Sequence, residues 1–242
     1  MILDGWGNSP DPKVSAIDHA NTPFIDSLYK NYPFATLRTD GLHVGLPEGQ
    51  MGNSEVGHMN LGAGRIVYQD LVKVNLAVEN KTLNTEKVLV DAFKYAKENN
   101  KDVHFLGLLS DGGVHSHINH LYGLIDAADD FGLKNTFVHA FTDGRDVDPK
   151  SGYGFLTELE SHLEKSNAKL ATVTGRYYAM DRDKRWERVK LAYDALVNSV
   201  GEKTKNVTSA IQKSYDNDVT DEFIKPIIMT DDSENPVANI KE

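Results

Sequence analysis

The chain contains no cysteine. This absence excludes disulfide bonds, thiolate metal sites and thiol catalysis, and it is consistent with a reducing compartment. No apolar run approaches the roughly 18 residues that a membrane-spanning helix requires. The first residues also lack the basic region and the long apolar region of a signal peptide. Together these absences predict a soluble cytoplasmic protein without a membrane partner.

The chain also lacks an excess of basic residues. It has 26 Lys and Arg against 36 Asp and Glu, which gives a formal net charge of -10. Such an acidic balance argues against nucleic acid as a partner. The 242 residues are 40% hydrophobic and 26% charged, which is typical of a globular protein of one large or two small domains. An anion-binding site in this chain must therefore be a local basic cluster.

The most informative stretch is Gly52-Asn53-Ser54-Glu55-Val56-Gly57-His58. Two glycines bracket Ser54, and glycine permits backbone angles that can hold a serine on a sharp, exposed turn. A serine becomes a nucleophile only when a neighbouring group activates it, and no base adjoins Ser54 in the sequence. Ser54 as a helix N-cap is therefore the simpler interpretation. The pattern is not G-x-S-x-G, so a Ser-His-Asp triad is not indicated, whereas a metal-activated serine stays open.

Before this stretch the pattern is short and broken. Ile2 and Leu3 read as the end of an apolar strand, and Asp4 follows directly. A carboxylate at a strand end is a common position for ligand groups in α/β proteins, although an ordinary Asp-Gly turn is the alternative. A helix is predicted from Pro23, ending before Tyr32 and Pro33, and residues 34–39 alternate like a short strand.

After residue 100 strands and helices alternate. Apolar runs predict strands at 103–109, 136–142 and 169–174, and amphipathic patterns predict helices at 118–131, 154–165 and 185–200. A weaker signal predicts a helix at 207–215 and a strand at 226–229. This alternation predicts an α/β fold with a parallel sheet and right-handed crossovers.

Charged residues follow each of the three predicted strands. Because the carboxyl ends of parallel strands share one edge of a sheet, these side chains are expected to line one crevice: His115, Arg145, Asp146, Arg176 and Arg182. Guanidinium groups bind phosphate or carboxylate through two hydrogen bonds, and a carboxylate can accept a hydroxyl proton. The set predicts a site for a small anion that also has a hydroxyl group.

Several of these residues have simpler alternatives. Arg176 and Arg182 could pair with Asp181 or Asp183, and the pattern around Arg188 is typical of a solvated charged helix face.

Nearby histidines and aromatic residues also have simpler interpretations. His115, His117 and His120 do not have a diagnostic metal-ligand spacing, and the last two fit a helix surface or packing. Trp186 and Tyr193 fit packing in a core or an interface.

Five motifs in order closely resemble those of the cofactor-independent phosphoglycerate mutases, a family of the alkaline-phosphatase superfamily: Ile2-Leu3-Asp4-Gly5-Trp6-Gly7, Met51-Gly52-Asn53-Ser54-Glu55-Val56-Gly57-His58, Asp111-Gly112-Gly113-Val114-His115-Ser116-His117, Thr142-Asp143-Gly144-Arg145-Asp146 and Gly175-Arg176-Tyr177-Tyr178-Ala179-Met180-Asp181-Arg182. The resemblance implies a substrate-binding domain with a parallel sheet, at 69–242, inserted in an alkaline-phosphatase-like α/β domain. Residues 1–68 would be an incomplete part of that second domain.

The resemblance also implies residue roles and a reaction. Asp4 and Ser54 would bind metal, and Ser54 would be the nucleophile that becomes phosphoserine; the inserted domain would bind substrate through His115, Arg145, Asp146, Arg176 and Arg182. The implied reaction interconverts 3-phosphoglycerate and 2-phosphoglycerate by two phosphoryl transfers at a two-metal site. The implied metal is Mn²⁺, with Mg²⁺ as the alternative, without an organic cofactor, in a monomeric protein.

The family's chains continue beyond the matching region with further Asp and His metal ligands. No Asp-x-x-x-His plus Asp-His arrangement follows Ile228 here. The expectation is therefore a fragment without turnover of its own. An isolated binding module for phosphorylated acids, or another phosphomutase or phosphatase of the superfamily, is the alternative. Apolar residues such as Leu28, Phe34 and Leu37 are expected to lack cover.

Overall fold

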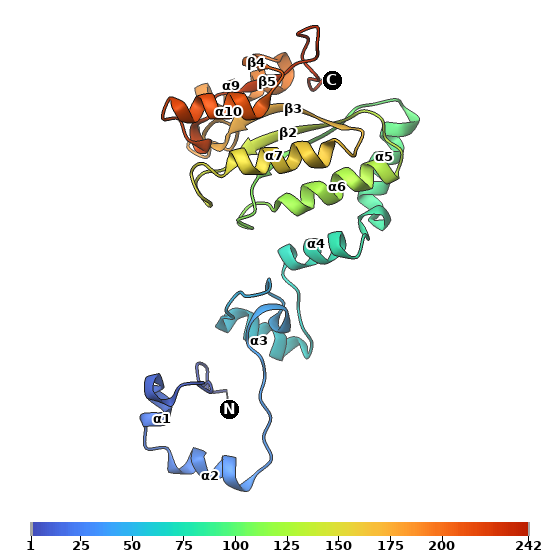
Figure 1. Cartoon of the computed structure of the whole chain (residues 1–242). Helices are drawn as coiled ribbons and strands as arrows, with labels where there is room; N and C mark the ends of the chain where they lie inside the picture. The colour runs from blue at the N-terminus through green and yellow to red at the C-terminus, as the bar shows by residue number, and fades with distance from the viewer. Residues whose placement is uncertain (1, 242) are drawn as a thin grey trace. The chain divides into compact units, whose positions relative to one another are not determined.

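The computed structural model describes residues 2–241. The chain forms two compact units, residues 1–73 and 74–242, and each is described by itself (Figure 1). No helix within residues 2–241 is long and apolar enough to cross a membrane.

The first unit consists of short helices joined by extended segments. Its elements are η1 (Pro12–Val14), α1 (Ala16–His19), α2 (Pro23–Asn31), η2 (Gly41–Val44), α3 (Ser54–Ala63) and the first turn of α4 (Asp70–Glu79). The predicted helix at Pro23 is confirmed as α2, because proline is favoured in the first turn of a helix and the chain turns extended at Tyr32. A small core contains Val44, Leu46 and Val56.

The two strands predicted in this unit are wrong. Residues 34–39 and Ile2-Leu3 have no strand assignment, because a strand requires a paired neighbour for its backbone groups and none of the described residues of this unit forms a strand. Their apolar side chains are correspondingly exposed, Phe34 at 64% and Leu37 at 80%. The expected lack of cover over these side chains is confirmed.

The second unit is an α/β domain. Its elements are the rest of α4, η3 (Leu83–Thr85), α5 (Lys87–Glu98), β1 (Val103–Leu109), α6 (Ile118–Asp130), β2 (Thr136–Thr142), α7 (Gly152–Leu163), β3 (Ala168–Gly175), α8 (Arg176–Ala179), α9 (Trp186–Asn198), β4 (Glu202–Thr204), α10 (Val207–Asp216), η4 (Asp221–Phe223) and β5 (Ile227–Met229). Helices α6 and α7 lie over the same face of the sheet (Figure 1). The alternating strands and helices predicted from residue 103 onward are confirmed.

The sheet has five strands in the order β1-β2-β3-β5-β4. β1, β2 and β3 are mutually parallel, as predicted. β5 pairs antiparallel with β3 and parallel with β4. The main core lies between this sheet and the helices, with fully buried residues such as Ile125, Leu156 and Val173. At about 25 cal/mol per Å² of buried apolar surface, this core is the main source of stability.

The strand register places three loops side by side. Leu109 at the end of β1 pairs with Thr142 at the end of β2, and Thr142 pairs with Gly175 at the end of β3. The three parallel strands therefore end at the same level. The loops that follow them start from one edge of the sheet.

Candidate functional site

A pocket of about 220 Å³ lies at this edge of the sheet. Its lining includes four of the five residues that the sequence assigned to one crevice: His115, Arg145, Arg176 and Arg182. The fifth, Asp146, contacts two of them. The structure therefore brings the predicted set together, because each residue lies on or just after a loop that begins at an aligned strand end.

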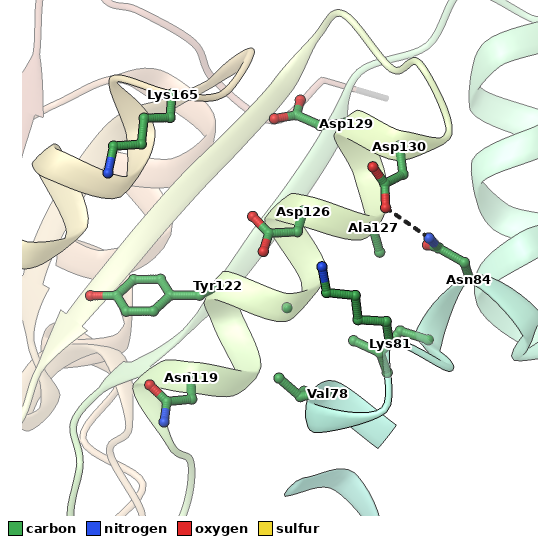
Figure 2. A pocket seen from close by; sticks show the side chains of 12 residues that line it. Val78, Lys81, Asn84, Asn119, Tyr122, Asp126, Ala127, Asp129, Asp130 and Lys165 are labelled. Carbon is green, nitrogen blue, oxygen red and sulfur yellow. Dashed lines mark hydrogen bonds between the residues drawn. The ribbon is translucent and has the colours of Figure 1, made fainter. Parts of the chain in front are cut away.

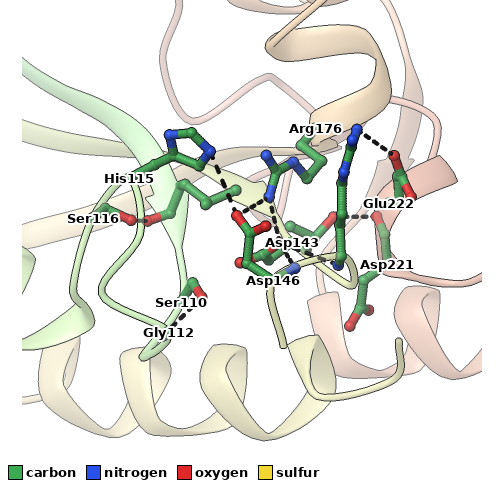
Figure 3. A network of polar contacts seen from close by, with 12 residues as sticks. Ser110, Gly112, His115, Ser116, Asp143, Asp146, Arg176, Asp221 and Glu222 are labelled. Carbon is green, nitrogen blue, oxygen red and sulfur yellow. Dashed lines mark hydrogen bonds and ion pairs between the residues drawn. The ribbon is translucent and has the colours of Figure 1, made fainter. Parts of the chain in front are cut away.

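Asp146 lies between His115 and Arg176 (Figure 3). Its Oδ2 atom accepts a hydrogen bond from Nη1 of Arg176 at 2.6 Å and lies 3.5 Å from Nε2 of His115. Among the contacts of the described residues, none goes to Oδ1 of Asp146. One carboxylate thus links a guanidinium and an imidazole and keeps an acceptor oxygen for a ligand hydroxyl.

Arg176 is the most buried of the pocket arginines, with 8% exposure. Its Nη1 atom donates to Asp146 and also to Oδ1 of Asp143, both at 2.6 Å. Burial opposes the charge of this guanidinium, yet the hydrogen bonds to the two carboxylates raise the pKa of Arg176 above its usual value. The suggestion that Arg176 pairs with Asp181 or Asp183 is wrong, because the carboxylates that follow β2 are closer.

Asp143 is 2% exposed and organises the loop after β2. Its Oδ1 atom accepts from the backbone N–H of Arg145 at 3.2 Å and of Asp146 at 3.0 Å. Burial works to raise the pKa of Asp143, but hydrogen bonds that include those from Asp146 and Arg176 lower it below the usual value. The turn also requires Gly144, which has φ +65 and where a Cβ atom would lie 2.8 Å from Cβ of Asp221.

A second buried carboxylate organises the loop that contains Arg182. The side chain of Asp181 is 1% exposed, and its Oδ2 accepts from the backbone N–H of Asp183 and Arg185. Its Oδ1 accepts from Nη1 of Arg188 at 3.2 Å. Arg182 makes no ion pair with another described residue, so the suggested pairing of Arg182 with Asp181 or Asp183 is also wrong.

Arg188 is a pocket residue that the sequence did not indicate. Its side chain is 20% exposed, and its guanidinium lies 3.8 Å above the ring of Tyr177. The expectation of a solvated charged face is therefore wrong at Arg188. The charge pattern within α9 did not indicate this role of Arg188, because its partner Asp181 lies before the helix begins.

Glu222 and Phe223 complete the lining from a distant part of the chain. The η4 segment reaches the pocket because Gly175 allows a close approach: a Cβ there would lie 2.4 Å from the carbonyl oxygen of Glu222. Glu222 lies 3.9 Å from Arg145. No motif or periodicity in the sequence marks this segment.

Ser54, in the first unit, is exposed at the start of α3. Its hydroxyl donates to Oδ2 of Asp4 at 2.6 Å, which joins two predicted metal ligands that lie far apart in the sequence. The N-cap is Asn53, whose side chain accepts from the N–H of Val56. The interpretation of Ser54 as the N-cap is therefore wrong, and its hydroxyl is free of that structural role.

His58 cannot act as the base for Ser54 in this arrangement. Its Nδ1 atom lies 2.8 Å from the carbonyl oxygen of Ser54 and 3.2 Å from the hydroxyl oxygen. A carbonyl oxygen only accepts hydrogen bonds, so Nδ1 must bear the proton.

Of the two glycines that bracket Ser54, only Gly52 is required by its surroundings. A Cβ atom at Gly52 would lie 1.7 Å from the carbonyl oxygen of Thr39, whereas a Cβ at Gly57 would meet open space.

Asp4 and Ser54 fit as two oxygen ligands of a hard divalent cation. Within residues 2–241 no group of three or more His, Cys, Asp or Glu side chains that could hold a metal ion is present. Asp4 and Ser54 are therefore only two candidate oxygen ligands, and no step is assigned through a metal.

The remaining histidines and aromatic residues serve local roles. Nδ1 of His117 accepts from the N–H of Asn119 at the start of α6, and His120 is bonded to Asn75, which confirms surface and packing roles. Trp186 and Tyr193 are not core residues, because they are 71% and 57% exposed.

A second cavity lies elsewhere, beside α6 (Figure 2), with a volume of about 490 Å³. Its carboxylates already have partners: Asp130 accepts from Asn84 and Asp126 lies 2.8 Å from His162. It contains none of the predicted functional residues.

The fold and the pocket define an α/β protein with an arginine-rich pocket at the carboxyl edge of a parallel sheet. The family model described as BPG-independent PGAM N-terminus (iPGM_N) matches residues 74–242. The chain belongs to this family, the 2,3-bisphosphoglycerate-independent phosphoglycerate mutases.

Relatives support the same assignment. The chain is 72% identical over 242 residues to the 2,3-bisphosphoglycerate-independent phosphoglycerate mutase of Flavobacterium psychrophilum, with all of this chain and 48% of that protein covered. It is 58% identical over 228 residues to that of Bacteroides fragilis, with 94% of this chain and 45% of that protein covered. The chain thus spans about half the length of these relatives.

A solved structure is also similar. It is the phosphoglycerate mutase of Leishmania mexicana at low cobalt concentration, with a TM-score of 0.72 and 36% identity over 93% of this chain and 43% of that chain. The predicted α/β class is confirmed.

Proposed function

We propose that residues 69–242 form the substrate-binding part of a phosphoglycerate mutase, and that the pocket at the strand ends binds 3-phosphoglycerate and 2-phosphoglycerate. The main support is the set of groups around that pocket, which combines arginines with one His-Asp pair whose Nε2 and Oδ2 atoms lie 3.5 Å apart. Guanidinium N–H groups match the geometry of phosphate and carboxylate oxygens. In this proposal Arg145, Arg176 and Arg182 hold the two anionic groups.

The hydroxyl of the substrate is assigned to Asp146 and His115. Oδ2 of Asp146 is occupied by Arg176, so Oδ1 would accept the hydroxyl proton. His115 contacts the same carboxylate through its Nε2 atom and would orient it. A carboxylate within hydrogen-bond reach of a hydroxyl can act as its general base.

Ser54 is proposed to take the phosphoryl group and return it to the other hydroxyl of the glycerate, which makes the whole protein an intramolecular phosphotransferase with a phosphoserine intermediate. Oδ2 of Asp4 accepts a hydrogen bond from the Ser54 hydroxyl, with 2.6 Å between the two oxygens, so the lone pairs of the hydroxyl oxygen point away from Asp4. A divalent metal would supply charge stabilisation and lower the pKa of the serine hydroxyl.

The proposed metal is Mn²⁺, with Mg²⁺ as the alternative, and it would need ligands beyond Asp4 and Ser54. The protein is proposed to be a monomer, with residues 1–68 and 69–242 as parts of two domains. The proposal also includes a lack of turnover by this chain, since Asp4 and Ser54 alone do not complete a two-metal site. Incubation with 3-phosphoglycerate and Mn²⁺ should give no 2-phosphoglycerate. Clear conversion would disprove the inactivity.

The binding proposal is tested by calorimetric titration of the chain with 3-phosphoglycerate. Arg182→Ala should raise Kd by about tenfold or more, since a charged hydrogen bond contributes about 1.5–3 kcal/mol. Arg182 has no ion-pair partner among the described residues, so its removal leaves no carboxylate stranded. Arg38→Ala is the matched control, because Arg38 lies in the first unit and pairs with Asp40. Equal affinities for all three proteins would refute the proposal.

A further inference from the structure

We propose that Asp143 is a positioning residue whose carboxylate sets the orientation of three groups proposed to bind substrate, those of Arg176, Arg145 and Asp146. This inference rests on the function proposed above. Asp143 is 2% exposed, so it does not touch a ligand. It acts through the groups that do.

The contacts of one oxygen atom support the inference. Oδ1 of Asp143 accepts hydrogen bonds from the N–H of Arg145, the N–H of Asp146 and Nη1 of Arg176. These three donors belong to three of the five predicted substrate-binding residues. Two of them follow β2 and one follows β3, so this oxygen ties two loops of the pocket together (Figure 3).

The charge of Asp143 matters separately from its shape. An asparagine amide oxygen could accept both backbone hydrogen bonds, but it could not neutralise Arg176. The side chain of Asp143 is buried, and Ser110 also helps to lower its pKa, so an asparagine there would mainly remove the negative charge that pairs with the buried Arg176. The 2.6 Å contact with Arg176 therefore explains why a carboxylate occupies this position.

The arrangement fixes which atoms of Arg176 remain for a ligand. Nη1 donates to Asp143 and Asp146 on one side of the guanidinium. Since the guanidinium is a planar fork of five donors, fixing Nη1 directs the other N–H groups as a unit. Without the charge of Asp143, the guanidinium of Arg176 would be held only by Asp146 and could rotate about that single contact.

The test compares Asp143→Asn with Asp143→Ala and with Asp231→Asn in the full chain. Asp231 is a matched control, because its Oδ1 also accepts two backbone N–H groups, of Ser233 and Asn235, in a loop that does not line the pocket. NMR of the arginine side chains reports the Arg176 guanidinium directly, amide exchange reports the turn, and titration with 3-phosphoglycerate reports affinity.

In Asp143→Asn the amides of Arg145 and Asp146 should stay protected, whereas the slowly exchanging guanidinium signal of Arg176 should be lost. The Kd for 3-phosphoglycerate should rise about tenfold or more, with no change in Asp231→Asn. Asp143→Ala should lose the amide protection as well.

Two results would overturn the inference. One is an Asp143→Asn protein with an unchanged Arg176 signal and a Kd within about twofold of the parent, since a tenfold change corresponds to about 1.4 kcal/mol. The other is loss of the turn in Asp143→Asn to the same extent as in Asp143→Ala, which would reduce Asp143 to a structural role. If the parent chain does not bind 3-phosphoglycerate, the proposed function fails, and the Arg176 signal still decides the role of Asp143.

Discussion

Replacement of Arg176 by alanine should destabilise the second unit strongly. Arg176 is the cation that two carboxylates share, each at 2.6 Å. Its removal strands the side chains of Asp143 and Asp146, which are only 1% and 19% exposed. Removing one partner of a buried ion pair costs about 3–5 kcal/mol, and we expect about 3 kcal/mol here because Asp146 keeps some contact with solvent.

Urea unfolding followed by circular dichroism measures the loss. Arg145→Ala is the matched control, because Arg145 is also a pocket arginine, but its side chain is 51% exposed and lies 3.9 Å from Glu222. An exposed pair of this kind contributes about 0–1 kcal/mol. If Arg176→Ala costs no more than Arg145→Ala, the account of the buried pair is refuted.

The penalty should also depend on pH. In the parent chain the pKa of Asp143 is lowered by folding, so its contribution to stability is present above its unfolded value and is lost as pH falls through the folded pKa. Without Arg176 the buried Asp143 favours its neutral form instead, and protonation relieves the repulsion. The difference in unfolding free energy between parent and Arg176→Ala should therefore shrink as pH falls from 7 towards 4. A constant or growing difference would contradict this reasoning.

Other positions give separable predictions. Burial lowers the pKa of His139 to about 4, so the fold holds this residue in its neutral form. About 3 kcal/mol of unfolding free energy should therefore be lost as pH falls from 6.5 to 4. His139→Asn should flatten the plot of urea-unfolding free energy against pH in that range, and an unchanged slope would argue against this account. Gly144→Ala should cost roughly 1–3 kcal/mol, because a Cβ at φ +65 meets Asp221, whereas Gly154→Ala, with open space in α7, should be neutral or stabilising by thermal unfolding. Tyr215→Phe should cost about 1–3 kcal/mol in the same assay, because the Tyr215 hydroxyl donates to the buried carboxylate of Asp221; a loss below the error of the measurement would contradict that role.

Much of the second unit could be predicted because its apolar pattern and its structure agree. The runs at 103–109 and 136–142 are β1 and β2 with the same bounds. The interior strand β2 is almost wholly buried, as a continuously apolar run predicts, whereas the edge strand β1 is buried only in part. From those bounds alone, the parallel-sheet rule placed the loops of His115 and Arg145 at one edge. The helix α5 and the short strand β4 were not predicted; β4 has only three residues and depends on β5 for its pairing.

The rest depends on contacts between residues far apart in the sequence. The strand predicted at 34–39 failed because alternation alone does not provide a pairing partner. Asp143 resembles an ordinary Asp-Gly turn, and only the structure shows its contact with Arg176 across two strands. Glu222 reaches the pocket through the close approach at Gly175, which no local pattern encodes.

The carboxylates in and behind the pocket outnumber its arginines. Four arginines line it, and three of them, Arg145, Arg176 and Arg188, pair with five carboxylates: Asp143, Asp146, Asp181, Asp183 and Glu222. In a chain with a net charge of -10, such a pocket offers no long-range electrostatic steering to an incoming anion. Its selectivity would come from directed N–H groups at short range, so added salt should leave the rate of association with 3-phosphoglycerate unchanged or slightly faster.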